Sequence, residues 1–188
     1  MKLLLHACCA PCLIIPYENL SKDFQVSVLW YNPNIHPLTE QMKRLEAIKI
    51  FETEMEAKVI YQTQYHLTEF FREIVFRENN RCGFCYYDRL KTTAVIAKKG
   101  NFDFFSTTLQ QSHQQDREQI ISFSKELSEI YKIRFYEFDF RYDWKRGVEI
   151  SKKLGMYRRQ YCGCIYSEKE RYEKQYEKFT QKLKEKSL

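Results

Sequence analysis

Apolar runs alternate with amphipathic stretches along the chain. Runs of mostly apolar residues predict buried strands, whereas apolar positions repeated every three or four residues predict helices. We expect strands at residues 2–6, 26–31, 58–62, 102–106 and 133–139. We expect helices at 11–20, 37–55 and 67–76, two that end near 99 and 131, and two more at 145–154 and 165–186. One face of the second helix carries Leu38, Met42, Leu45, Ile48, Phe51 and Met55.

The alternation of strands and helices predicts an α/β fold with a mostly parallel sheet flanked by helices. Ligands of such sheets lie at the carboxyl ends of the strands. Three polar groups follow three of the predicted strands and should therefore share one edge, which is the candidate active site. They are Cys8 to Cys12, the pair Asn32 and Asn34, and the pair Thr107 and Thr108.

Composition narrows the class of protein. A chain of 188 residues with 44% hydrophobic residues, 5 glycines and 4 prolines is expected to form a single folded domain, 1–188, with residues 167–188 as a C-terminal helical extension. The net charge of +6 suits a polyanionic partner, although many ordinary proteins carry as much. Only three leucines precede His6, which is too short for a signal sequence, and no apolar run is long enough to span a membrane. We expect a cytoplasmic protein with reduced thiols and no membrane partner.

Seven cysteines then indicate metal or redox chemistry rather than disulfides. A closed zinc site uses four thiolates and would leave three over, whereas iron–sulfur clusters are also held by thiolates. The residues alone leave a cluster, zinc and inert core cysteines open. The cysteines form three groups, which are Cys8, Cys9 and Cys12; Cys82 and Cys85; and Cys162 and Cys164.

The last group has the pattern Cys-Gly-Cys. Such a pair can close into a strained, easily reduced disulfide or chelate one metal, and Gly163 relieves backbone crowding between the two thiols. Two unrelated loop cysteines are the plain alternative.

Other polar and aromatic residues are expected to be structural. A lone His6 at the end of a strand fits a hydrogen-bonded core histidine. The apolar stripe of the last helix is expected to be a packing face, and it consists of Tyr172, Tyr176, Phe179 and Leu183. Several polar residues near the proposed edge are likewise expected to be structural or solvated rather than catalytic, and they include Asn34, Glu40, Arg44, Arg89 and Ser112.

Five segments together resemble a known family, the cobalamin-independent epoxyqueuosine reductases. In chain order from Leu3 to Cys164 they are LLLHACCAPC, YNPNIHP with Glu40 and Arg44, CGFCYYDRL followed by TA, FDFFSTTL with Ser112, and QYCGC. Each segment alone is weak, whereas the joint occurrence of the double cysteine, C-x-x-C-Y and Y-C-G-C is specific.

The resemblance implies the last step of tRNA queuosine synthesis, in which epoxyqueuosine is deoxygenated to queuosine. It implies a fold related to the nucleotide α-hydrolase (HUP) folds and a 4Fe-4S cluster, with no cobalamin. Cys8, Cys9, Cys82 and Cys85 match the cluster positions, and Cys162 with Cys164 matches a redox-active pair. The family can hold an additional mononuclear iron. Because adjacent residues rarely point both side chains at one cluster, Cys8 and Cys9 can be split between two metals, with Cys12 as a further ligand.

The implied partners are tRNA carrying epoxyqueuosine in its anticodon loop and an electron donor that the sequence does not identify. We expect an open basic groove that leads to the metal edge. Arg158 and Arg159 would contact phosphates there, and Tyr157 and Tyr161 could stack on bases. Asn34, Thr107 and Thr108 complete the expected substrate-binding set.

Two other functional classes compete with this interpretation. An ATP-dependent tRNA-modifying enzyme of similar fold would need a glycine-rich phosphate loop after the first strand, and HACCAPC contains no glycine. A zinc-stabilised nucleic-acid-binding module would be distinguished by metal analysis.

Overall fold

A computed structural model describes residues 1–186 and contains one five-stranded sheet, in the order β3-β2-β1-β4-β5. Every neighbouring pair of strands is parallel, which confirms the expected α/β class. The strands are β1 (Lys2–His6), β2 (Gln25–Tyr31), β3 (Lys58–Gln62), β4 (Phe104–Thr107) and β5 (Arg134–Phe135). The α-helices are α1 (Ala10–Leu20), α2 (Leu38–Glu54), α3 (Leu67–Ile74), α4 (Arg81–Lys99), α5 (Arg117–Tyr131), α6 (Trp144–Lys153) and α7 (Ile165–Lys186).

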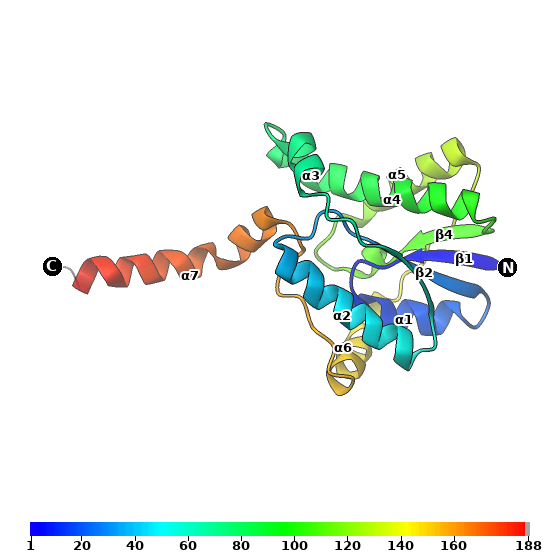
Figure 1. Cartoon of the computed structure of the whole chain (residues 1–188), viewed down its shortest axis with the longest axis horizontal. Helices are drawn as coiled ribbons and strands as arrows, with labels where there is room; N and C mark the ends of the chain where they lie inside the picture. The colour runs from blue at the N-terminus through cyan, green and yellow to red at the C-terminus, as the bar shows by residue number, and fades with distance from the viewer. Residues whose placement is uncertain (187–188) are drawn as a thin grey trace.

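Helices cover both faces of the sheet. Figure 1 shows α4 and α5 on one face and α1, α2 and α6 on the other. The core residues divide in the same way, because Leu3 and Leu5 belong to one buried cluster and Leu4 belongs to the other. A central strand buried on both faces needs apolar side chains at every position, and this explains the unbroken leucine run at the start of the chain.

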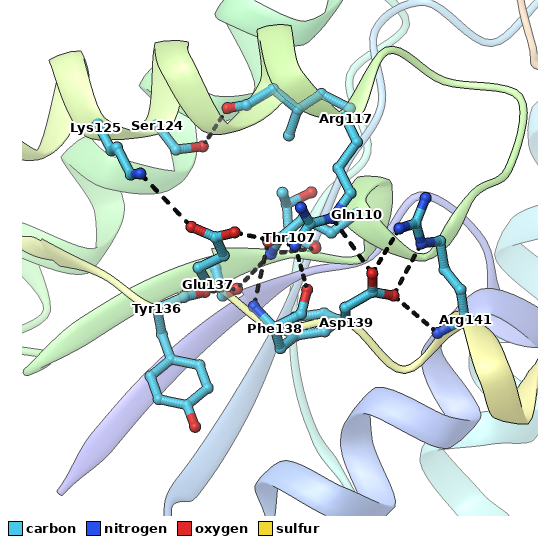
Figure 2. Close-up of polar contacts among 12 residues, drawn as sticks. Thr107, Gln110, Arg117, Ser124, Lys125, Tyr136, Glu137, Phe138, Asp139 and Arg141 are labelled. Atoms are coloured by element: carbon cyan, nitrogen blue, oxygen red, sulfur yellow. Dashed lines mark hydrogen bonds and ion pairs between the residues drawn. The ribbon is translucent and has the colours of Figure 1, made fainter.

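The fifth strand is much shorter than the expected 133–139, and the fourth begins at Phe104 rather than Phe102. The Tyr136 N–H still donates to the Phe105 carbonyl oxygen of β4 over 2.9 Å, but further along side chains bind the backbone in place of a neighbouring strand. The Phe138 N–H donates to Gln110 Oε1 over 3.3 Å, and Arg117 donates to the Phe138 carbonyl oxygen over 3.2 Å. Figure 2 shows this network, in which Arg117 also reaches Glu137. Residues 136–140 therefore do not form a regular strand.

The buried face of α2 differs from the expected apolar face. Leu38 and Met42 are 49% and 54% exposed, whereas Glu40 and Arg44 are only 6% and 2% exposed. The two buried charges neutralise each other, with 2.7 Å between Arg44 Nη2 and Glu40 Oε1. This helix therefore turns an ion pair, rather than its first apolar residues, toward the interior.

Helix α7 projects away from the body of the fold (Figure 1). Its first turns are attached to α3 and α4, because Arg81 pairs with Glu170 and the Tyr166 ring lies 6.5 Å from the Phe71 ring. The expected packing of its stripe is wrong for Tyr176 and Phe179, which are 67% and 58% exposed. The predicted extension, 167–188, reaches two residues, 187 and 188, that lie outside the described residues.

Among the described residues, none of the helices is both long enough and apolar enough to cross a membrane.

Candidate active site

Polar groups that follow β1, β2 and β4 meet at one edge of the sheet. The Asn32 side-chain amide donates to the Ala7 carbonyl oxygen over 2.8 Å. The backbone N–H of Cys8 donates to Thr108 Oγ1 over 2.9 Å. The expectation that these three segments share an edge is confirmed.

Three thiols converge where β1 turns into α1. Cys8, Cys9 and Cys12 are buried, and their sulfur atoms all lie within 4.8 Å of one another. Cys9 caps α1 with an extended backbone, so its neighbours Cys8 and Cys12 can reach the same point from the strand end and the first helical turn. Adjacent cysteines thus do point at one place here, with 3.9 Å between Cys8 Sγ and Cys9 Sγ. This triad is a set of donors that can hold a metal or an iron–sulfur cluster.

The three thiols differ in acidity. Hydrogen bonds from Cys12 and Cys8, helped by the charge of Arg159, hold the pKa of Cys9 well below its usual range. Hydrogen bonding to its two neighbours and burial raise the pKa of Cys12. Thiolates are the form that binds metal, and a helix N-terminus favours them. The hydrogen bonds within the triad and the charge of Arg159 thus favour a thiolate in this group of cysteines.

Thr107 and Thr108 support the triad from β4. Both are fully buried. Thr108 Oγ1 donates to Cys8 Sγ over 3.3 Å, and Thr107 Oγ1 lies 2.9 Å from Nδ1 of His6. His6 is fully buried, as expected for a core histidine, and burial lowers its pKa to about 4. The hydroxyls of both threonines are engaged within the protein, which fits positioning of the triad better than the expected contact with substrate.

The other four cysteines line a single cavity of about 570 Å³. Cys82 and Cys85 lie in the first turns of α4, and Cys164 directly precedes α7. The structure thereby joins the C-x-x-C and C-x-C groups, although 77 residues separate Cys85 from Cys162 in the chain. Asn34 and Tyr161, two of the expected substrate-binding residues, line the same cavity.

Arg89 connects this cavity to the sheet edge. It donates to Cys85 Sγ over 3.0 Å and approaches Asn32 Oδ1 at 3.5 Å. Burial raises the pKa of Cys85 to about 12, and the guanidinium opposes this rise. Burial thus opposes loss of the Cys85 proton, and Arg89 is the charge that favours the thiolate.

The loop that carries Cys162 and Cys164 is held by α2. Arg44 donates to the carbonyl oxygens of Cys162 and Tyr161, over 2.8 and 3.0 Å. Glu40 binds Arg44 and also accepts a hydrogen bond of 2.6 Å from the Tyr157 hydroxyl. Two residues that the sequence placed near the site, without a role, therefore act as the support of the thiol loop.

The loop also depends on Gly163 and on the two tyrosines before it. Gly163 has φ +155°, and a Cβ there would lie 3.2 Å from the Asn34 side chain. The Tyr161 hydroxyl donates to the His36 carbonyl oxygen over 2.7 Å. Because the hydroxyls of Tyr157 and Tyr161 both bind within the protein, these residues order the loop, and only ring faces remain for a base.

Arg159 lies between the two groups of thiols. It lines the 570 Å³ cavity and also a second one, of about 290 Å³, beside Cys9 and Cys12. Arg158, the other expected phosphate ligand, lines the second cavity but not the first, and Trp144 lines the second cavity as well. The two cavities share a wall made of Ser112, Gln114, Arg159 and Gln160.

Several residues of the site had no individual signal in the sequence. Gln115 donates to Cys162 Sγ over 3.6 Å, and the Ser167 hydroxyl accepts from the Gly163 N–H over 3.1 Å. Arg81 and Arg171 also line the large cavity, together with Glu170, which pairs with Arg81. Of these residues, only Ser167 could have been found from the sequence, because a polar residue three positions after Cys164, at the start of a predicted helix, fits a helix-capping pattern.

Comparison with known proteins assigns the chain to a family. A family model described as epoxyqueuosine reductase QueH matches residues 3–170. A protein named epoxyqueuosine reductase QueH from Dehalococcoides mccartyi is 38% identical over 174 residues, covering 92% of this chain and 96% of its own. Proteins of the same name from Thermotoga maritima and Streptococcus pyogenes are 33% and 30% identical, covering 91% and 89% of this chain and 92% and 70% of their own lengths.

Fold and site define an α/β protein with a thiol-rich centre at the carboxyl edge of a parallel sheet, and the named relatives make it an oxidoreductase. The matched residues include all seven cysteines and end at residue 170, in the first turns of α7. The chain belongs to the epoxyqueuosine reductase QueH family.

Proposed function

We propose that this protein reduces epoxyqueuosine to queuosine in tRNA. The observation that carries the proposal is the proximity of the two groups of thiols, because the cavity lined by four cysteines shares four lining residues with the cavity beside Cys9 and Cys12 of the triad. A deoxygenation needs an electron-donating centre next to a substrate-binding cavity, and this edge of the sheet has thiols that can hold such a centre beside a cavity.

The donor set fits an iron–sulfur centre. We assign Cys8, Cys9, Cys82 and Cys85 to a 4Fe-4S cluster and Cys12 to an additional iron. Support comes from the convergence of the triad and from Arg89, which binds Cys85; although burial lowers the pKa of Arg89, the thiols of Cys85, Cys162 and Cys8, in that order, raise it. A bound cluster would supply electrons one at a time. The role of the protein is to exclude water from the buried triad and to neutralise thiolate charge through Arg89 and Arg159.

Cys162 and Cys164 can balance the reaction. Removal of the epoxide oxygen as water breaks two C–O bonds, forms a C=C bond and requires two electrons and two protons. Oxidation of the dithiol to a disulfide releases two electrons and two protons, and an external electron donor then restores the thiols. Arg44 and Gly163 keep the two thiols at the cavity.

The large cavity fits a nucleobase that has left its neighbours. Anticodon-loop bases can be splayed out and held by stacking and edge contacts. Asn34 is 2% exposed, and its Oδ1 has no hydrogen-bond partner among the described residues, so it can read a donor on the base. Tyr161 offers its ring, and Arg158, Arg159 and Arg171 offer charge to the phosphates.

The competing functions are not favoured. The turn after β1 contains three cysteines and no glycine, which does not suit a phosphate loop, and a zinc module would not need the second group of thiols.

The test is anaerobic purification followed by quantitation of iron, sulfide and zinc, with turnover measured on tRNA that carries epoxyqueuosine. We expect a brown protein with about four or more irons per chain and conversion to queuosine in the presence of a reductant. A colourless protein with stoichiometric zinc and no conversion would refute the proposal.

A further inference from the structure

One aromatic residue, between α3 and α4, is both strained and almost fully exposed. Phe76 is 95% exposed, and its backbone has φ +62°. Positive φ is a genuine outlier for a bulky residue, because the β-carbon crowds the following carbonyl oxygen. Three other residues besides glycine have positive φ within the described part of the chain, and all three are polar: Glu56, Asn101 and Lys132.

The strain arises from the turn that ends α3. The Arg77 N–H donates to the Ile74 carbonyl oxygen over 2.8 Å, and Val75 between them has φ −57° and ψ 132°. Together with the positive φ of Phe76, these angles match a type II β-turn, whose third position usually holds glycine. The exposed ring gains little from packing to offset the strain. A strained side chain that contributes so little to the fold points to a role outside it.

One glutamate joins this turn to the rim of the large thiol cavity. Glu78 Oε1 accepts from the Phe76 N–H over 3.1 Å, and the Glu78 carbonyl oxygen accepts from Arg81 over 3.1 Å. Arg81 and the next residue, Cys82, line the cavity of about 570 Å³. Phe76 is therefore two hydrogen bonds away from the cavity to which the proposed function assigns the epoxyqueuosine base.

The surroundings of the ring suit a nucleobase. Arg72 and Arg77 are exposed, and neither forms an ion pair within residues 1–186. Two carboxylates of α3, Glu69 and Glu73, line a different cavity. Aromatic rings that stack on bases, flanked by cations that contact phosphates, are the usual means of binding single-stranded nucleic acid. A protein partner would need a larger apolar patch than this turn offers.

We propose that Phe76 stacks on an unpaired base of the anticodon loop, next to the base that enters the thiol cavity. Arg72 and Arg77 would contact the flanking phosphates. When one base leaves the stack, a face of its neighbour is uncovered, and an aromatic ring can take the vacant place. The inference rests on the proposed function and adds how the tRNA is held. Because Phe76 does not line the cavity, it acts on tRNA affinity and not on the chemical step.

The first experiment measures the affinity of the anaerobic holoenzyme for tRNA that carries epoxyqueuosine, by filter binding. Phe76→Ala should raise the dissociation constant about 5- to 150-fold, the loss expected for one stacked base, whereas Phe76→Tyr should bind as wild type. The salt slope should not change in Phe76→Ala, because the ring carries no charge, whereas Arg77→Ala should reduce its magnitude by about 0.7. The matched control is Val75→Ala, which removes a 42% exposed apolar side chain from the same turn and should bind as wild type.

Stability separates a binding role from a structural one. Phe76→Gly should have a urea midpoint of unfolding at or above that of wild type, because glycine adopts a positive φ without strain. It should nevertheless bind tRNA as weakly as Phe76→Ala. Urea midpoints well below that of wild type in both variants would make the ring structural and overturn the proposal.

Cross-linking tests the contact itself. Anticodon stem-loops with iodouridine at one loop position at a time should cross-link to Phe76 from a position next to epoxyqueuosine. Unchanged tRNA affinity in Phe76→Ala would overturn the proposal, and so would an equal loss in Val75→Ala, since the turn would then act through apolar area rather than stacking. In both cases wild-type conversion of epoxyqueuosine persists, whereas failure of the proposed function appears as no conversion by wild type at any tRNA concentration.

Discussion

Arg44 donates a hydrogen bond of 2.8 Å to the carbonyl oxygen of Cys162, which lies 118 residues further along the chain. The same guanidinium binds Glu40, one turn earlier in α2. The position of the C-terminal thiols is therefore set by a buried ion pair in the N-terminal half of the protein.

Substitution of Arg44 by Met should destabilise the protein by about 3–5 kcal/mol, because Glu40 would remain buried without its partner. The matched control in the same helix is Lys49→Met, which breaks the exposed pair of Lys49 and Glu52 and should cost about 1 kcal/mol or less. Urea unfolding of the anaerobic protein measures both. Equal losses in the two variants would contradict the role given to Arg44.

Gly163→Ala should lose turnover in addition to stability, whereas a comparable glycine variant elsewhere should lose stability only. The new Cβ would lie within 3.4 Å of the Asn34, Ile35 and Arg44 side chains, and the backbone at φ +155° disfavours any residue other than glycine. Gly155→Ala is the control, since Gly155 also has a positive φ, +64°, but open space around the added atom. Both should lose about 1 kcal/mol or more of stability, and only Gly163→Ala should lose turnover. Equal activities would show that the loop tolerates the shift.

Two cysteine variants should separate metal binding from redox chemistry. If Cys82 is a ligand of the proposed cluster, Cys82→Ser should lose most of the visible absorbance of the cluster and all turnover, because a ligand is removed. Cys164→Ser should abolish turnover and retain most of the absorbance. Loss of the absorbance in Cys164→Ser would make that cysteine a metal ligand and remove the dithiol step.

Besides His6, whose pKa burial also lowers to about 4, a second buried histidine, His36, should make the stability fall in mild acid. This side chain is 2% exposed, and burial lowers its pKa to about 4, against 6.5 in the unfolded chain. Between these values the unfolded chain binds a proton that the folded protein does not. The contribution is therefore present above about pH 6.5 and is lost as the pH falls towards 4, by about 3 kcal/mol in full.

His36→Phe should flatten this part of the pH profile, since the ring lies 4.9 Å from Phe70 and 5.5 Å from Phe71 and has an apolar surrounding. The exposed His113→Gln is the control and should keep the wild-type slope. Unfolding free energies at pH 7 and pH 5 give the comparison. A His36→Phe profile as steep as that of wild type would assign the acid sensitivity to other groups.

The two arginines of the loop should differ in their effect on tRNA binding. Arg158→Ala should weaken binding and reduce the magnitude of its salt slope by about 0.7–0.9, the value expected for one lost phosphate contact, with a small effect on the cluster. Arg159→Ala should also change the cluster, because this guanidinium lies beside Cys9 and Cys12. Filter binding at several salt concentrations and the visible spectrum measure the two effects. An unchanged slope in both variants would remove the loop from the tRNA interface.

Local patterns determined the α/β class and the shared edge of β1, β2 and β4. Both follow from short-range rules: apolar runs form strands, helices return the chain, and the carboxyl ends of parallel strands meet. The cysteine groups were visible for the same reason, since each lies within a few residues of sequence.

Only the tertiary structure decided how those groups combine. It placed Cys85 with Cys162 around one cavity and turned Arg44 inward instead of Leu38. It also gave the backbone of Phe138 side-chain partners, Gln110 and Arg117, in place of a continued β5. Each of these outcomes depends on a partner far away in the chain. A periodic pattern in the sequence predicts which residues share one face of a helix or strand. Whether a charged residue on that face is buried, or whether a strand finds a neighbour to pair with, depends on the segments that pack against it in the folded molecule.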